Sequence, residues 1–375
     1  MNQFKQCILQ TIIFVTFLLL SATALAASET KRVLMVLSGY GQQAGEETPG
    51  YEFDEFSKAY LVFKHHGVEV DIASPQGGQI EADKYDPSKP YNAAILADEA
   101  IMAKLSNTLS IAGLTADHYD SVFVVGGKGA MFDLPNDESL QQLIADIYQQ
   151  QGSVAAVCHG PAAIVNVKLD DGSYLVANKA VNGFTNEEEQ LFGKKWINDF
   201  DFMLEDKLVE RGGKFQSSDI MLNHVAVDGR LITGQNPSST VAVATELVKS
   251  MGIKSKPMDT FKDDATLALV AQILAGDKNA EKTLSMSQEQ YNIPLVGMYG
   301  FYYLNTTDND QELKNALVLM SLAKDAINNP RLDMQIAKVQ HQLGETKAAM
   351  DTLNQLLVAA PDFKPAIEML ETLVL

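Results

Sequence analysis

The chain has 375 residues, in which 29 Lys and Arg stand against 48 Asp and Glu, giving a formal net charge of −19. This acidic balance argues against nucleic acid and anionic lipid surfaces as partners. A single hydrophobic core rarely grows beyond about 250 to 300 residues, so the length predicts two domains.

The N-terminus has the pattern of a secretory signal. Lys5 precedes an uncharged apolar run over residues 8–20, and small residues follow at Ala24 and Ala26, as a signal peptidase requires. The run is shorter than the stretch of about 20 apolar residues that spans a bilayer. We therefore expect residues 1–26 to be a cleaved signal peptide. The mature protein is then periplasmic, without stable membrane insertion.

The sequence contains two cysteines, Cys7 and Cys158. Cys7 lies within the predicted signal peptide, so the mature chain keeps Cys158 alone and forms no internal disulfide. A single thiol in an oxidising compartment is a candidate reactive group. The alternative is an inert thiol that fills space in the core.

Strand and helix signals alternate in the first part of the chain. Short β-prone runs occupy residues 33–37, 68–73, 122–125 and 154–157, and helical patterns occupy residues 53–66 and 140–151. This alternation predicts an α/β fold with a parallel sheet covered on both faces. Residues 222–234 predict a hairpin that turns at Asp228-Gly229. Ligand sites in such sheets lie beyond the carboxyl ends of the strands, and Cys158 follows one such end.

Cys158 has small residues two positions away on each side, Ala156 and Gly160. A strand that turns at once into a helix places its junction residue in a strained, exposed position, and only small neighbours avoid a clash there. The pattern is that of a nucleophile elbow with cysteine in place of serine. The dipole of the following helix is expected to lower the pKa of the thiol.

Three motifs together resemble the PfpI/ThiJ superfamily. They are Ala155-Ala156-Val157-Cys158-His159-Gly160-Pro161, Gly126-Gly127-Lys128-Gly129-Ala130-Met131-Phe132-Asp133-Leu134-Pro135 and Leu231-Ile232-Thr233-Gly234-Gln235-Asn236-Pro237. The resemblance covers residues 31–251 and implies a flavodoxin-like, class I glutamine amidotransferase-like sandwich. An insertion over about residues 79–119 points to the larger chaperone and glyoxalase branch. We therefore expect a catalytic domain over residues 27–253.

The resemblance implies a proton partner for the cysteine. Relatives carry a glutamate twelve residues before the Gly that opens the second strand, and counting back from Gly67 reaches Glu55. In relatives this carboxyl group contacts the cysteine and shares its proton. Glu52 is the competing candidate, and an ordinary exposed helix carboxylate is the alternative reading. A carboxyl beside a thiolate should have a raised pKa, because like charges disfavour double ionisation.

The resemblance also gives His159 a catalytic role in moving protons to and from the substrate. An acidic residue after the next strand should orient it, and alignment on Gly183-Phe184-Thr185 selects Glu189. Glu187 and Glu188 are interpreted as solvated, although three consecutive glutamates leave the register open.

The remaining implied roles concern the substrate. The N–H groups of Gly127 and His159 are expected to stabilise an oxyanion, and Gly126 and Lys128 to line the substrate pocket; the alternative for the Gly-Gly pair is a plain tight turn. Relatives commonly have histidine at the position of Lys128, so the substrate stays open. The sequence offers no clear metal-ligand set, and we expect no metal and no cofactor.

Residues 254–375 have a different character. Amphipathic helical patterns replace strand signals, and Ala316 and Ala349 lie 33 residues apart, near the period of about 34 residues of tetratricopeptide repeats. We expect an all-α, tetratricopeptide-like tail; a generic helical extension is the alternative. It is expected to pack on the catalytic domain or on another subunit, or to bind a partner or protein clients. Because the resembling domain ends near residue 252, truncation after Lys254 should spare the active-site thiol.

The resemblance favours a cofactor-independent glyoxalase that converts methylglyoxal or related 2-oxoaldehydes to 2-hydroxy acids. The alternatives are a protein or amine deglycase, a holdase chaperone or redox-sensing scaffold, and a cysteine peptidase or amidase. A homo-oligomer is also among the expectations.

Overall fold

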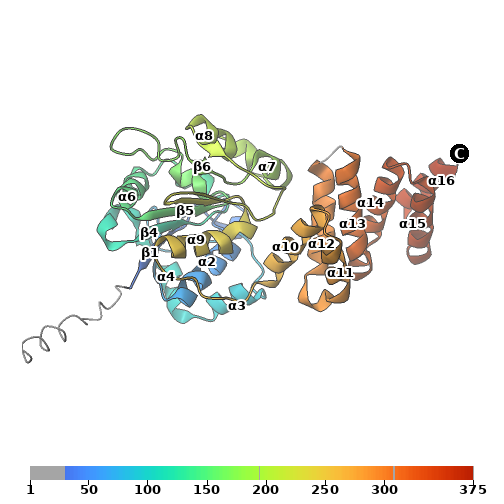
Figure 1. The fold of residues 1–375 in the computed structure, drawn as a ribbon, viewed down its shortest axis with the longest axis horizontal. Coiled ribbons are helices and arrows are strands. Elements are labelled where there is room, and N and C mark those ends of the chain that lie inside the picture. The colour runs from blue at the N-terminus through green and yellow to red at the C-terminus, as the bar shows by residue number, and fades with distance from the viewer. Residues whose placement is uncertain (1–29, 194, 307–308, 375) are drawn as a thin grey trace, which may run out of the picture.

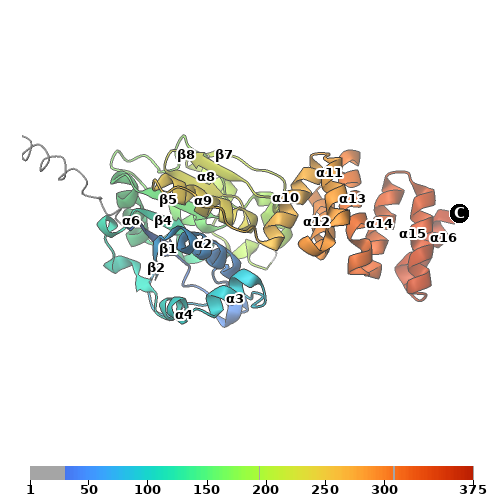
Figure 2. The same cartoon turned by 60° about the horizontal axis from the view of Figure 1, so that its bottom comes forward.

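The protein is described by a computed structural model that covers residues 30–193, 195–306 and 309–374. The predicted signal peptide, with Cys7, lies outside the described residues. An α/β body is followed by a row of helices that extends away from it (Figures 1 and 2). Within the described part of the chain, no helix is long and apolar enough to cross a membrane.

The body is built on a seven-stranded sheet in the order β3-β2-β1-β4-β5-β9-β8, parallel except for β8, which pairs antiparallel with β9. The strands are β1 (Arg32–Val36), β2 (Glu69–Ser74), β3 (Leu109–Ser110), β4 (Ser121–Val124), β5 (Ser153–Val157), β8 (Val225–Asp228) and β9 (Leu231–Gly234). Two further short strands, β6 (Ala180–Val181) and β7 (Lys214–Phe215), pair with each other. The predicted α/β class and parallel sheet are confirmed, as is the hairpin at Asp228-Gly229.

Helices flank this sheet. They are α2 (Phe53–His66), α3 (Pro90–Leu96), α4 (Glu99–Ser106), α5 (Ala130–Asp133), α6 (Glu138–Gln149), α7 (Asn186–Phe192), α8 (Leu204–Glu210) and α9 (Thr240–Ser250). Helices α2 and α9 pack side by side, and α6 packs against β4 and β5. The central strands β4 and β5 are completely buried, which explains why their sequences are continuous apolar runs.

In the described part of the chain, seven α-helices follow the body. They are α10 (Lys262–Leu274), α11 (Lys278–Met286), α12 (Ile293–Tyr303), α13 (Asp310–Ile327), α14 (Pro330–Gln342), α15 (Thr346–Ala359) and α16 (Lys364–Val374), and we call them the helical tail. Between Ser250 and Lys262 the chain forms no helix or strand, and the predicted division after residue 253 falls in this stretch. Small residues let the tail helices cross closely: a Cβ on Gly300 would lie 2.9 Å from Leu319 Cβ.

The tail does not have a core entirely of its own. Ile220 and Leu222 of the body belong to the same buried cluster as residues of α10, α12 and α13, and the half-buried Leu191 of α7 packs against it. The last three helices form a separate, smaller cluster. The first half of the tail is thus packed directly on the body.

Candidate active site

Cys158 occupies the turn that follows β5, at the carboxyl edge of the sheet. Its φ is +60°, a left-handed conformation that is uncommon for a residue with a side chain. Its N–H donates to the Gly234 carbonyl at 2.9 Å, which fastens the turn to β9. A Cβ on Gly160 would lie 2.5 Å from the Val124 carbonyl oxygen, so this position requires glycine. The junction has the strained geometry that the small flanking residues predict, but the predicted exposure was wrong, because Cys158 is buried.

Glu55 lies in the first turn of α2, completely buried, against the Cys158 side chain. Its Oε2 accepts a 2.7 Å hydrogen bond from the N–H of Gly126, two residues after the end of β4. A Cβ placed on Gly126 would be 2.7 Å from Glu55 Oε2 and 2.8 Å from Cys158 Cβ, so the glycine makes room for both side chains. Glu52 has a different place: its side chain caps α2, where it accepts from Asp54 N.

Burial controls the electrostatics of this pair. It raises the pKa of the Glu55 carboxyl well above its usual range, and the neighbouring Glu52 adds to the effect. Burial also raises the pKa of the Cys158 thiol, helped by the negative charge of Glu55. The expectation that a helix dipole lowers the thiol pKa was wrong. The segment after Cys158 is a five-residue 3-10 turn, Gly160–Ile164, and the thiol is only 3% exposed.

Two adjacent negative charges are costly in a buried site, so the two groups titrate as a coupled pair. When Glu55 holds the proton, Cys158 is a thiolate beside a carboxylic acid. When Cys158 holds it, Glu55 is the anion. This exchange gives the site a nucleophile and a proton donor from one shared proton.

His159 completes a chain of polar contacts with Cys158. Its Nδ1 lies 3.4 Å from Cys158 Sγ and its Nε2 lies 2.7 Å from Glu189 Oε2, and all three side chains are buried. An ionised carboxylate can only accept, so the proton of the neutral ring belongs on Nε2 and Nδ1 faces the thiol as an acceptor. The structure therefore brings Glu189 to the position predicted for the orienting residue.

The other two glutamates differ from each other. Glu187 is exposed, as expected. The interpretation of Glu188 as solvated was wrong, because it is fully buried and accepts from Met221 N at 2.6 Å, Gln235 Nε2 at 3.0 Å and Asn236 Nδ2 at 2.8 Å. It also forms a capping box with Thr185. The Thr-x-x-Glu spacing was the available sequence signal for this role.

Glu188 is an anchor for α7. Its carboxylate ties the helix that carries Glu189 to the segment after β9, and it ties that helix to the loop at Met221. Burial raises the pKa of the carboxyl group, and the hydrogen bonds that it accepts act in the opposite direction.

Gly127 follows β4 with φ +94°, and a Cβ there would lie 2.4 Å from Glu52 N. Only glycine fits this turn. Within the described part of the chain, the N–H groups of Gly127 and His159 donate to no protein acceptor. Both belong to turns at the carboxyl ends of adjacent strands, β4 and β5. They are available to stabilise an oxyanion, the role that the resemblance implies.

Aromatic side chains border His159. Phe184 lies 4.5 Å and Phe200 6.2 Å from its ring centroid, and Phe132 contacts Phe200 at 5.4 Å. Phe132 is part of the second sequence motif, but nothing in that motif signals a contact with Phe200, which lies 68 residues later. These rings form an aromatic border on one side of the catalytic groups.

A model of the DJ-1/PfpI family matches residues 48–250 of the chain. The chain belongs to this family. Among curated relatives, Glyoxalase 3 of Candida albicans is 30% identical over 234 residues, covering 58% of this chain and 97% of the relative. The glutathione-independent glyoxalase hsp3101 of Schizosaccharomyces pombe is 30% identical over 249 residues, covering 60% and 96%.

Solved structures agree with this assignment. The crystal structure of glyoxalase III from Candida albicans has a TM-score of 0.54 at 27% identity, covering 59% of this chain and 97% of that one. Rapid Encystment Protein 24 KDa of Francisella tularensis has a TM-score of 0.55 at 32% identity, covering 59% and 99%. The family match ends at residue 250, before the first helix of the tail.

Lys128 is the position at which this DJ-1/PfpI domain departs from the pattern expected of relatives. Its side chain is half-buried, near the carboxyl groups of Glu52 and Asp83. Burial raises the pKa of Glu52 to about 7, and Lys128 lowers it in part. Burial likewise raises the pKa of Asp83, again against Lys128. The described residues include no group of three or more His, Cys, Asp or Glu side chains placed to hold a metal ion.

Proposed function

We propose that this protein is a glutathione-independent glyoxalase that converts methylglyoxal or a related small 2-oxoaldehyde to the 2-hydroxy acid. The observation that carries the proposal is the contact of Cys158 with two separate proton-handling groups, Glu55 on one side and His159 with Glu189 on the other. The relatives named as glutathione-independent glyoxalases support the same activity.

The first step is addition of the thiolate. Cys158 Sγ bonds to the aldehyde carbon, and the carbonyl electron pair moves to oxygen, where the N–H groups of Gly127 and His159 stabilise the charge. Loss of one such donor typically costs about 3 to 4 kcal/mol of transition-state stabilisation. The Glu55 carboxylic acid donates the proton that neutralises this oxygen, which gives a hemithioacetal.

The second step is an internal redox exchange. A base, for which His159 Nδ1 is positioned, removes the proton from the former aldehyde carbon while the neighbouring carbonyl oxygen gains a proton, giving an enediol. A proton is then added to the neighbouring carbon and the hydroxyl on the sulfur-bearing carbon loses its proton, which produces a 2-hydroxy thioester. Water then cleaves the C–S bond and the thiolate leaves. The net reaction adds one water molecule to the 2-oxoaldehyde and needs no external oxidant or cofactor.

Burial of the nucleophile favours a small substrate. Cys158 is 3% exposed and His159 2% exposed, and a polypeptide chain cannot reach either without rearrangement of the rings around them. This argues against the peptidase reading and against direct attack on glycation adducts of intact proteins. Methylglyoxal supplied without glutathione is the discriminating substrate, because a deglycase acting on adducts requires a preformed amine or thiol adduct.

Export is a separate part of the proposal. We propose that residues 1–26 direct the chain to the periplasm and are then removed, as their sequence pattern indicates. A glutathione-independent reaction suits that compartment. N-terminal sequencing of the protein from a periplasmic fraction should find a start near Ala27, and Met1 on membrane-bound protein would contradict export with cleavage.

A further inference from the structure

The helical tail contacts the helix that carries Glu189. Tyr302 of α12 packs its ring on Phe192 of α7, with centroids 4.9 Å apart and the planes at 64°. Leu191, the preceding residue of α7, packs against the cluster that α10, α12 and α13 form. Phe192 and Leu191 lie only two to three residues after Glu189, so this face of α7 is supported by the tail.

The loop that Glu188 holds is also inserted into the tail. Ile220 and Leu222 are 2% and 6% exposed and are buried among tail residues. Met221 between them donates its N–H to Glu188 at 2.6 Å. The tail therefore packs around Ile220 and Leu222, the residues on either side of the Met221 N–H that holds α7 through Glu188.

A second contact reaches the helix that carries Glu55. Lys58 lies one turn further along α2 and is 4% exposed. Its Nζ contacts two carboxylates in the first turn of α10, Asp264 Oδ1 at 2.6 Å and Asp263 Oδ2 at 3.2 Å. Tyr91 of the body donates to the same Asp263 at 2.8 Å. A buried cation is stable only with such partners, and both of its carboxylate partners come from the tail.

These contacts converge on the active site. We infer that the helical tail is a positioning element of the active site, holding α2 through Lys58 and α7 through Phe192, and so fixing Glu55 and Glu189 on the two sides of Cys158 and His159. Misplacement of a reacting group by about 1 Å can cost on the order of 100-fold in rate. The inference revises the expectation that truncation after Lys254 spares the site, because truncation would remove all of these contacts.

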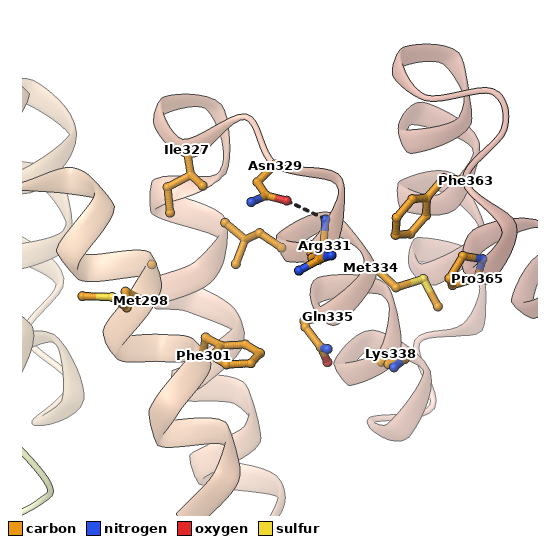
Figure 3. A pocket seen from close by; sticks show the side chains of 12 residues that line it. Met298, Phe301, Ile327, Asn329, Arg331, Met334, Gln335, Lys338, Phe363 and Pro365 are labelled. Carbon is orange, nitrogen blue, oxygen red and sulfur yellow. Dashed lines mark hydrogen bonds between the residues drawn. The ribbon is translucent and has the colours of Figure 1, made fainter. Parts of the chain in front are cut away.

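An exposed residue of the same helix, α12, provides a control. Met298 and Phe301 line a groove of about 550 Å³ between α12, α14 and the start of α16, on which Arg331 and Lys338 also border (Figure 3). Met298 is 49% exposed and lines this groove. Met298→Ala perturbs the same helix without removing the Tyr302–Phe192 contact or the Lys58 ion pairs.

The test compares Tyr302→Ala, Tyr302→Phe and Met298→Ala in the full chain, with methylglyoxal turnover and iodoacetamide labelling of Cys158 as readouts. Tyr302→Ala should lower kcat about tenfold or more with KM within about twofold, because geometry and not binding is lost. Labelling of the loosened thiol should become faster at neutral pH. Tyr302→Phe keeps the ring and should restore both values, and Met298→Ala should match the parent protein.

Asp264→Asn tests the ion pair between Lys58 and α10. It should also lower kcat and speed labelling of Cys158, and it provides the test of the inference if Tyr302→Ala fails to fold. The inference is overturned if Tyr302→Ala and Asp264→Asn both behave like the parent, or if Met298→Ala loses as much kcat as they do. The turnover readout rests on the proposed function, whereas labelling does not. Absence of turnover in the parent would refute the glyoxalase proposal and leave the labelling comparison to judge the tail.

Discussion

Glu55→Gln should separate activity from stability. The change removes a proton carrier from the thiol while keeping a side chain of the same shape, whose oxygen can still accept from Gly126 N, the 2.7 Å bond of the parent. Loss of general acid and base function typically costs about 10²- to 10⁴-fold in rate. We expect kcat for 2-oxoaldehydes to fall by that range with the fold intact.

The same substitution should make the protein more stable at neutral and alkaline pH. The carboxyl has a folded-state pKa raised by burial above its ordinary value of 4.5. The unfolded chain therefore ionises first, and the folded state loses stability as pH rises from about 4.5 through the higher folded-state pKa. Glutamine does not ionise, so Glu55→Gln does not lose stability in this pH range.

The size of the effect follows from the burial. Each unit by which the folded-state pKa of Glu55 exceeds its ordinary value costs about 1.4 kcal/mol of folding stability at a pH above both values, and glutamine, which does not ionise, has no such cost. In a chain of this size each such unit corresponds to a rise in Tm of roughly 2–4 °C. The rise should be present at pH 8 and small at pH 4.5, measured by thermal unfolding across this range.

Glu371→Gln is the matched control, because it makes the same charge change at an exposed position on α16. It should alter neither kcat nor the pH dependence of Tm. The reasoning is refuted if Glu55→Gln is less stable than the parent at pH 8, or if its effect on Tm is the same at pH 4.5 and pH 8.

Three further substitutions probe the rest of the site. Glu189→Gln should lower kcat by about 10²- to 10⁴-fold by favouring the wrong tautomer of His159, with little change in Tm; an unchanged kcat would remove Glu189 from the mechanism. Glu188→Ala should lower the free energy of unfolding by at least about 3 kcal/mol, because it leaves several buried donors without an acceptor, and chemical denaturation that shows a smaller loss would contradict its anchoring role. Gly127→Ala should cost about 1–3 kcal/mol through its φ of +94° alone and should depress kcat by moving an oxyanion donor, so a variant with parental stability and kcat would show that the turn is not constrained.

Local sequence signals were sufficient where the structure is local. The elbow at Cys158 depends on Ala156 and Gly160, two residues away, and its strained φ of +60° follows from them. Glu55 was located by the family resemblance, which places a glutamate twelve residues before Gly67, the residue that ends α2 in a left-handed conformation. The parallel sheet needed only the alternation of apolar runs with helical patterns, because connections of that kind favour parallel neighbours.

The failures involve partners far along the chain. Glu188 reads as solvated within a run of three glutamates, but its acceptor role depends on donors 33 and 47 residues away. The thiol pKa was misjudged because a dipole argument considers only the next few residues, whereas burial and Glu55 dominate. The ion pair between Lys58 and Asp264 joins residues 206 apart, and neither residue signals the other in the sequence.

The central claim is that Cys158 is the nucleophile of a glutathione-independent glyoxalase. Its most direct test is the incubation of purified protein with methylglyoxal in the absence of glutathione, with lactate measured as the product, for the parent and for Cys158→Ala. We predict lactate from the parent and none above the uncatalysed background from Cys158→Ala, since the predicted mature chain has no other thiol. Equal lactate formation by both proteins, or none by a correctly folded parent, would contradict it.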